Sequence, residues 1–410
     1  MKKKNIYLLL LMALVVMSCS ENETIERISH ERGIDFGIYT SRTATTRGVE
    51  MDLPQLKTDA FGVLAYYTNQ NPWLKAAGST HPNFMYNQQI KWDSTLGEWT
   101  YSPIRYWPNN TDAKVSFFAY APYNNPAIAL SGSDEGDTGT PTITFTVADE
   151  VSEMVDFVTA VAIDKTKAPL ETATNSDAAK VVFNFKHELS RVAFKAKPSE
   201  QLYLAGNDAH KTYINIKSAV LSSSTDGNFY KQATYTFPNE NDTEADDNFV
   251  GTWDYTNALT FSSLDIDNLL ATDKALFNRV GDAYRDEASL PIEGVMIGDE
   301  ANNEAVSIFG KNELDKERYL FFIPASTVEG GGLGDGAATV TFEYDIVTID
   351  NNLVNGYSCT SAVKTVNLPK GTLRQGTAYT YTFIFNVDRV EVKATVIPWK
   401  VGGQIIETLF

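Results

Sequence analysis

Apolar side chains recur at every second position in several windows of this chain. In residues 378–387 one face carries Tyr379, Tyr381, Phe383, Phe385 and Val387, and the other carries Thr380, Thr382 and Asn386. The same alternation occurs in 115–119, 181–185, 339–347 and 390–396, and in 339–347 it directs Val340, Phe342, Tyr344 and Ile346 inward. A period of two is typical of β-strands with one buried face. Clusters of turn-forming residues, such as 131–134 and 329–336, separate these windows.

Helical periodicity is scarce. The best window for a helix is 263–280, where Leu264, Asn268, Ala271 and Leu276 form a ragged stripe. Antiparallel strands joined by turns predict an all-β fold built from sandwiches. A chain of 410 residues has room for two sandwich domains in tandem, and the polar stretch 171–177 places their boundary near Ala178. The predicted domains are therefore 49–178 and 179–410.

The N-terminus has the pattern of an export signal. Lys2, Lys3 and Lys4 precede an apolar run, 6–17, that is too short to cross about 30 Å of hydrocarbon. The run ends at Val16-Met17-Ser18-Cys19, which resembles the lipobox of bacterial lipoproteins. We therefore predict that residues 1–18 are a signal peptide and that Cys19 is acylated, which would anchor the protein to the cell outer membrane. The alternative is an ordinary cleaved signal followed by a chance cysteine.

Composition limits the classes of partner. The net charge is −18, and loss of a leader with three lysines would make the mature chain more acidic still, so nucleic acid is not an expected partner. The acidic stretch 20–23 behind Cys19 resembles a signal for the outer face of the outer membrane, although a solvated tether fits it equally well. Cys359, the second of two cysteines, has no disulfide partner if Cys19 carries lipid, so stability must come from burial.

Residues 19–48 combine a tether, a short strand and a basic linker. Ile34, Phe36 and Ile38 alternate with more polar neighbours, which predicts one strand. The stretch 40–48 that follows is small, polar and basic, and exposed segments of this kind are where proteases cut. We read the segment as a leader strand on a cleavable linker, the alternative being a plain linker whose arginines aid solubility.

The chain lacks the patterns of an enzyme or a metalloprotein. None of the four histidines lies at metal-ligand spacing from another or from a cysteine, and no Gly-x-Ser-x-Gly motif occurs. The glycine-rich loop 332–337 precedes a strand instead of opening a helix, and the acidic runs 134–137 and 242–247 lack the spacing of a calcium loop. We expect no catalytic residue, no cofactor and no metal, and we expect His187 to be structural.

Four stretches, spread over most of the chain, together resemble the fimbrillin family of lipoprotein pilins. They are 99–108 (WTYSPIRYWP) with 115–122 (VSFFAYAP), 154–157 (MVDF) with 181–195 (VVFNFKHELSRVAFK), 319–324 (YLFFIP), and 376–385 (GTAYTYTFIF) with 394–399 (ATVIPW). The resemblance implies two transthyretin-like antiparallel β-sandwich domains, no enzymatic activity, and other pilin subunits as partners. It also implies assembly by strand exchange, in which an arginine-specific protease removes the first strand and a neighbour's C-terminal strand replaces it.

On this chain the matching cut lies between Arg47 and Gly48, and the strand that leaves contains Ile34, Phe36 and Ile38. The C-terminal tail is the candidate donor strand, with Ile405, Ile406, Thr408, Leu409 and Phe410 as its residues. The physics agrees, since removing an edge strand leaves backbone groups and apolar pockets that a donated strand satisfies. The tail beyond Trp399 is short, however, and it fits a last strand of its own domain equally well.

Two functions of different classes therefore follow from the sequence. The first is a structural and adhesive fimbrium subunit, able to attach to a host or bacterial surface ligand. The alternative is a non-polymerising glycan-binding lipoprotein of the cell surface, because tryptophans on sandwich loops can stack on sugars. The candidates for stacking are Trp73, Trp92, Trp99, Trp107 and Trp253. Core packing is the competing interpretation for each of them.

Overall fold

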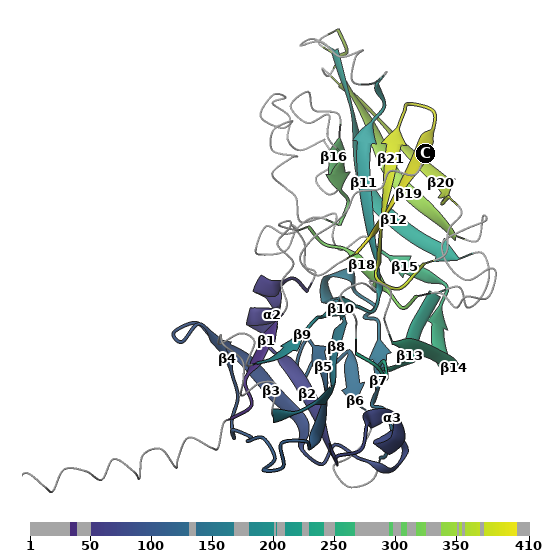
Figure 1. Cartoon of the computed structure of the whole chain (residues 1–410). Coiled ribbons are helices and arrows are strands. Elements are labelled where there is room, and N and C mark those ends of the chain that lie inside the picture. The colour runs from purple at the N-terminus through teal and green to yellow at the C-terminus, as the bar shows by residue number, and fades with distance from the viewer. Residues whose placement is uncertain are drawn as a thin grey trace, which may run out of the picture.

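The computed structural model is an elongated molecule in which two halves stack end to end (Figure 1). It describes residues 33–38, 51–130, 137–167, 180–200, 202, 210–223, 229–241, 251–266, 295–297, 305–309, 317–324, 338–350, 352–354, 357–369 and 373–399. Cys19, Arg47, Gly48 and the tail 404–410 lie outside these residues. In the parts described, no helix is long and apolar enough to span a membrane.

The lower half contains two antiparallel sheets. A six-stranded sheet has the order β10-β8-β5-β2-β3-β4 and a four-stranded sheet the order β14-β13-β7-β6. The first comprises β2 (Phe61–Asn69), β3 (Met85–Asp93), β4 (Glu98–Thr100), β5 (Lys114–Ala121), β8 (Val158–Lys165) and β10 (Lys186–His187). The second comprises β6 (Ile128–Leu130), β7 (Thr142–Thr146), β13 (Phe229–Thr236) and β14 (Thr252–Phe261). Short helices α3 (Trp73–Ala76), η1 (Ala77–Ser79) and η2 (Val151–Glu153) lie in the connections.

The six-stranded sheet is buried on both faces. Phe118 and Tyr120 of β5 point into the core shared with the four-stranded sheet, whereas Phe117 and Ala119 point into a second core. This second core is closed by the two-stranded sheet of β1 (Phe36–Ile38) with β9 (Val181–Phe183), and by helix α2 (Leu53–Asp59). The prediction of one buried face for 115–119 is therefore wrong, because a third layer covers the face expected to meet solvent.

The upper half is a second pair of sheets, and the core between them is continuous with the core shared with the four-stranded sheet. One sheet has the order β17-β11-β21-β22 with β18 also on β11, and the other has the order β15-β12-β19-β20 with β16 also on β12. The strands are β11 (Ser190–Pro198), β12 (His210–Ser223), β15 (Ser263–Asp265), β16 (Val295–Ile297), β17 (Val306–Ser307), β18 (Leu320–Phe322), β19 (Ala338–Asp350), β20 (Tyr357–Asn367), β21 (Thr377–Phe385) and β22 (Val390–Pro398). The ring of Phe342 packs against Phe383 and Phe385 between the sheets, with centroids 4.7 and 5.3 Å away.

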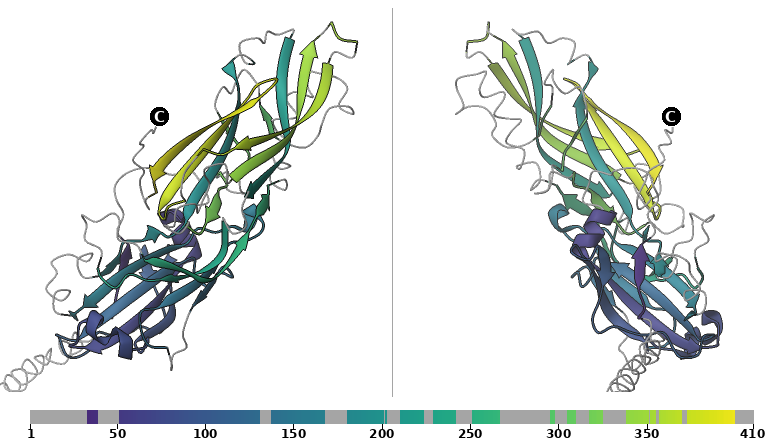
Figure 2. Two further views of the ribbon diagram at one scale, coloured as in Figure 1. Left: turned by 90° about the vertical axis from the view of Figure 1, so that its right-hand side faces the viewer. Right: turned by 60° about the vertical axis from the view of Figure 1, so that its left-hand side comes forward.

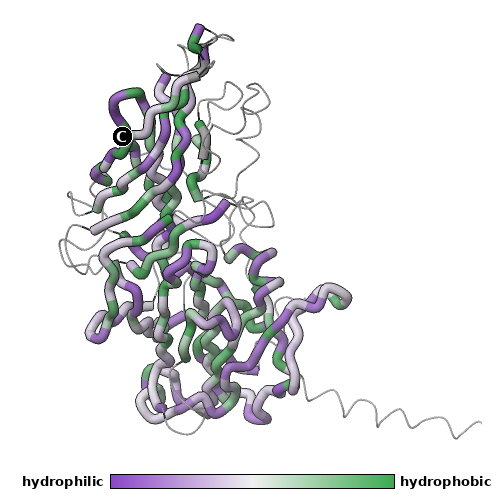
Figure 3. The backbone as a smooth tube through the Cα atoms, turned by 180° about the vertical axis from the view of Figure 1, so that it is seen from behind, coloured by the Kyte–Doolittle hydropathy of each residue, from purple (hydrophilic) through white to green (hydrophobic). Residues whose placement is uncertain are grey.

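The all-β class and the sandwich layers predicted from the alternation are confirmed. Hydrophobic and hydrophilic positions interleave along the strands (Figure 3), and Tyr379, Tyr381, Phe383 and Phe385 are buried as expected. Val387 is exposed, because β21 ends at Phe385. In β19 the alternation changes phase at Asp345, so that Val347 is buried and Ile346 is half-buried.

One prediction about local structure needs correction. Ser263–Asp265 is strand β15 paired with β12, so the helix predicted for 263–280 does not begin at Ser263; residues 267–280 lie outside the description. Ala178, the predicted domain boundary, also lies outside the description, and the boundary stays a prediction. Strands β13 and β14 follow that point in sequence, yet β13 pairs with β7 in the lower half. Figure 2 shows these strands beside the lower half in both views.

Candidate functional site

Strand β1 occupies a slot between two other segments. On one side it pairs in parallel with β9, and the Val181 N–H donates to the Asp35 carbonyl at 2.8 Å. On the other side the Ile34 N–H donates to the Arg105 carbonyl at 2.8 Å, and Gly33 forms a β-bridge with Tyr106. We call the slot between β9 and residues 101–106 the leader-strand groove. Both of its walls use backbone groups to hold β1.

Apolar side chains seal the groove. Ile34 and Phe36 are almost fully buried, and Ile38 is half-buried. The Phe36 ring lies 5.4 Å from the ring of Tyr101 and 5.6 Å from that of Phe183. Such aromatic pairs add to the free energy gained from burial. Of the three residues predicted to share the inner face, the structure thus places two in the core.

Tyr101 fastens the strand from the groove wall. Its hydroxyl donates to the Ile34 carbonyl at 2.8 Å. Burial raises the pKa of Tyr101 to about 12, whereas the Arg105 backbone N–H, which donates to the Tyr101 hydroxyl oxygen at 3.3 Å, acts in the opposite direction. The hydroxyl therefore keeps its proton, and its ability to donate, across the physiological pH range.

A second concentration of polar groups lies where the two halves meet. The His187 ring stacks on Trp399 with centroids 3.7 Å apart, and its Nδ1 lies 2.8 Å from Asp156 Oδ2. The Arg191 guanidinium lies over the Tyr319 ring at 4.3 Å and near Trp399 at 5.4 Å. We call these five residues the junction cluster. All are buried, so their interactions are made away from water.

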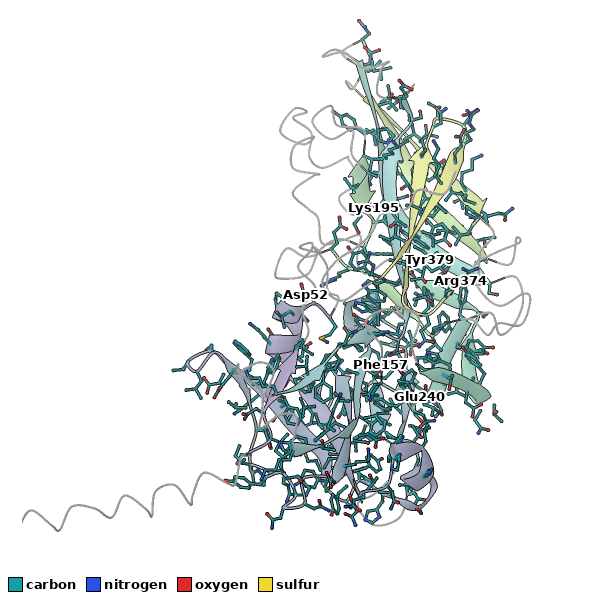
Figure 4. All side chains as sticks on the ribbon, in the orientation of Figure 1. Asp52, Phe157, Lys195, Glu240, Arg374 and Tyr379 are labelled. Carbon is teal, nitrogen blue, oxygen red and sulfur yellow. The ribbon has the colours of Figure 1, made fainter. Side chains whose placement is uncertain are left out.

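The backbone of Gly376 is hydrogen-bonded to two other segments at the junction. Its N–H donates to the Leu189 carbonyl at 3.0 Å, and its carbonyl accepts from the Trp399 N–H at 2.7 Å. Its φ of +60° is in the left-handed region, which favours glycine. In Figure 4, Phe157 is labelled within the lower half, and Arg374 and Tyr379 beside this turn at the base of the upper half.

Glu188 connects three sheets. Its carboxylate accepts from Thr159 Oγ1 on β8 at 2.6 Å and from Gln375 Nε2 just before β21. Thr159 in turn hydrogen-bonds the Tyr235 hydroxyl on β13 at 2.9 Å, and the Trp253 indole N–H donates to the Glu188 carbonyl at 3.1 Å. Burial raises the pKa of Glu188 to about 7, although these hydrogen bonds oppose the shift. The side chain thus couples the halves through a protonation state that changes near neutral pH.

The family-like stretches meet at these two places. Residues 99–108, 115–122 and 181–183 line the leader-strand groove, and 154–157, 187–191, 319–324, 376–385 and 394–399 meet at the junction. The sequence analysis identified His187 as structural, and its stacking on Trp399 agrees with that expectation. It missed Asp156, Glu188 and Arg191. The polar residues that flank Leu189 in 186–191, inside an apolar stretch, were the available signal for a buried polar cluster.

The tryptophans proposed for sugar stacking do not form an open platform. Trp73 and Trp107 are buried in the two cores, and Trp253 is half-buried at the junction. Trp92 packs its ring against the edge of Trp99, and Lys57 Nζ lies 3.7 Å from its centroid. Among the described residues, no group of three metal-ligating side chains occurs.

An all-β sandwich fold whose first strand fills a groove is the class of protein that these observations define. The fimbrillin-like family model matches residues 46–399, and the chain belongs to this family, as its motifs predicted. Over 398 residues the chain is 31% identical to the fimbrium subunit Fim1C of Phocaeicola vulgatus, covering 94% of this chain and 93% of that protein. A crystal structure of a fimbrial protein from Bacteroides vulgatus is similar with a TM-score of 0.67 at 29% identity, covering 90% of this chain and 100% of that one.

Proposed function

We propose that this protein is a fimbrium subunit that is exported as a lipoprotein and polymerises by protease-triggered donor-strand exchange. The observation that carries the proposal is strand β1, a short segment that fills a groove with hydrogen-bonding walls and an aromatic floor. A cut between Arg47 and Gly48 would separate β1 covalently from the body that begins at Met51. The role of the protein is structural and adhesive and involves no catalysis.

The energetics of the groove support exchange in place of simple loss. Without β1, the Val181 N–H loses the Asp35 carbonyl and the Arg105 carbonyl loses the Ile34 N–H, while the rings of Phe117 and Phe183 lose a buried neighbour. Unsatisfied backbone groups and exposed aromatic surface are unfavourable. An incoming strand restores both kinds of interaction, with main-chain hydrogen bonds for affinity and alternate side chains for specificity.

The partners follow from this mechanism. Other pilin subunits supply the incoming strand, and the tail with Ile405, Ile406, Thr408, Leu409 and Phe410 is the segment of this chain that would be donated. The relatives are described as fimbrial proteins, which agrees with a location on the cell surface. An arginine-specific protease makes the cut. The remaining expected partner is an adhesion ligand on a host or bacterial surface.

Limited proteolysis tests the exchange. Trace trypsin should cut the purified, unlipidated protein at Arg42 or Arg47, release β1 and produce SDS-resistant ladders as donated strands fill empty grooves. Intact mass and unboiled gels measure the two steps separately. A double variant, Arg42→Ala with Arg47→Ala, should keep β1 and stay monomeric under the same treatment. Digestion of the body as fast as the leader, or a clean cut without larger species, would contradict polymerisation.

Lipidation has its own test. Replacing Cys19 by alanine in a bacterium that exports the protein should abolish labelling with a palmitate analogue and move the chain from the membrane fraction to the soluble one. The acyl chains on Cys19 are the expected membrane anchor. Stable attachment takes more than one chain, so a variant that carries none should leave the membrane. Cys359→Ala is the matched control and should change neither measurement. Persistent labelling of the Cys19→Ala variant would rule out the anchor.

A further inference from the structure

An open cavity lies beside the start of the body, next to the junction cluster. It has a volume of about 350 Å³, and its lining includes Met51, Gln55, Asp59, Tyr123, Asn124 and Asp156. Two of these side chains are carboxylates, and no basic side chain lines the cavity. Its chemistry therefore favours a cation over an anion or a neutral ligand.

Asp156 gives the cavity its character. The residue is only 2% exposed. Its Oδ2 accepts from the Met51 N–H at 2.7 Å and lies 2.8 Å from His187 Nδ1, whereas Oδ1 is buried and has no hydrogen-bond partner in the described part of the chain. A buried carboxylate oxygen without a partner is unfavourable, and a charged donor placed against it would remove that cost.

Asp59 strengthens the preference for a cation. Both of its oxygens accept from Gln55 Nε2 at 3.0 Å, on helix α2. These bonds fix the position of a second carboxylate in the lining of the cavity. An ammonium group suits such a site, because its several N–H donors can reach more than one oxygen.

The cut that the proposed function requires creates an ammonium group close by. Hydrolysis of the Arg47–Gly48 peptide bond adds water, leaves a carboxylate on Arg47 and turns the Gly48 nitrogen into an α-ammonium. Gly48 lies three residues before Met51, and a chain spans at most about 3.6 Å per residue, so this nitrogen stays within about 11 Å of the Met51 nitrogen. Met51 is itself hydrogen-bonded to Asp156. Before the cut the same nitrogen is an uncharged amide.

We propose that the new α-ammonium of Gly48 binds Asp156 in this cavity and thereby marks the cut state of the protein. The inference rests on the proposed function for the position of the cut. The ammonium exists only in the cut protein, so its interaction with Asp156 stabilises the cut state and not the uncut state. A switch between two states requires such a difference in interaction free energy. Asp156 transmits the change, because its other oxygen contacts His187, which stacks on Trp399.

The test measures how fast the Gly48 α-amine reacts. In the full chain, residues 42–47 are replaced by Glu-Asn-Leu-Tyr-Phe-Gln, which a sequence-specific viral protease cleaves before glycine, so that Gly48 is freed whatever the natural cut. The monomer is isolated and labelled with an amine-acylating reagent at pH 8, and mass spectrometry follows the N-terminal peptide. Pairing with a carboxylate stabilises the unreactive ammonium form, so acylation should be at least tenfold slower than for the free peptide Gly-Val-Glu.

Two variants and one condition make the result decisive. Asp156→Asn should restore the rate of the free peptide, whereas Asp149→Asn, which alters a largely exposed carboxylate, should not. Unfolding the cut wild-type chain in urea should also restore it, which keeps the test valid if Asp156→Asn does not fold. Labelling of the native wild type at the rate of the free peptide would overturn the site. Ladder formation is measured on the same sample: ladders with fast labelling refute the amine site alone, and slow labelling without ladders refutes polymerisation alone.

Discussion

Replacing Phe36 by alanine should accelerate hydrogen exchange of the Val181 amide by about 100-fold or more in the uncut protein. A buried phenylalanine truncated to alanine costs about 3–5 kcal/mol, and each 1.4 kcal/mol is roughly a factor of ten in an equilibrium. The cost falls on the docking of β1, because Phe36 packs against Tyr101, Phe117 and Phe183 across the groove. The Val181 N–H is bonded to the Asp35 carbonyl, so its exchange reports the opening of β1 directly.

Two comparisons isolate this effect. Ile38→Ala removes a half-buried side chain from the same strand and should change the exchange of Val181 much less. The Glu188 amide, which is bonded to the Phe157 carbonyl at the junction, should exchange at the same rate in both variants and in the wild type. If the Val181 amide is as protected from hydrogen exchange in Phe36→Ala as in the wild type, then the ring contacts of Phe36 do not hold β1 in place.

Replacing Glu188 by glutamine should remove a pH dependence of stability that the wild type shows between about pH 4.5 and pH 7. The pKa of Glu188 is about 7 in the folded protein against 4.5 for the free side chain. Below pH 4.5 the proton is bound in both states and the contribution is fully present; as pH rises to 7 the unfolded state ionises first and stability falls by roughly 3 kcal/mol. Above pH 7 no further loss occurs.

Urea denaturation of the uncut chain at pH 5 and at pH 8 measures this loss. Glutamine keeps an acceptor oxygen for Thr159 and cannot ionise, so the variant should unfold at a higher urea concentration than the wild type at pH 8 and lose that advantage at pH 5. Glu200→Gln, at an exposed position, should follow the wild type at both values. An equal change in Glu188→Gln and wild type would mean that Glu188 is already ionised at pH 5 in the folded protein.

The sequence predicted the elements whose local pattern is sufficient to define them. Tyr379, Tyr381 and Phe383 alternate with threonines, and β21 is half-buried as that pattern requires. Ile34 and Phe36 likewise predicted a strand. Helix α2 was missed, although Asp52 accepts from the Gln55 N–H as its N-cap and Pro54 lies in its first turn. These capping residues were visible in the sequence. Helix α2 buries one apolar side chain, Leu56, however, so its sequence has no periodic row of apolar residues.

The remaining features depend on contacts between distant parts of the chain. The two-sided burial of β5 requires a layer supplied by 33–38 and 181–185, which no window around Phe117 contains. The partners of Glu188 lie 29 residues away at Thr159 and 187 residues away at Gln375. Periodicity indicates that a face is buried without indicating what buries it. The strand that fills the groove could be predicted from the sequence, but the residues that form the walls of the groove could not.

The return of β13 and β14 to the lower half has a consequence for biogenesis. Synthesis delivers a chain from its N-terminus, yet β7 has no neighbour on the β13 side until residues 229–236 have emerged. Until then a long nascent segment exposes an open sheet edge and the aromatic surface around Phe145, a state prone to aggregation. A holding chaperone is therefore expected to matter most during the interval between the emergence of β7 and that of β14, and synthesis stalled in that interval should yield the least soluble intermediate.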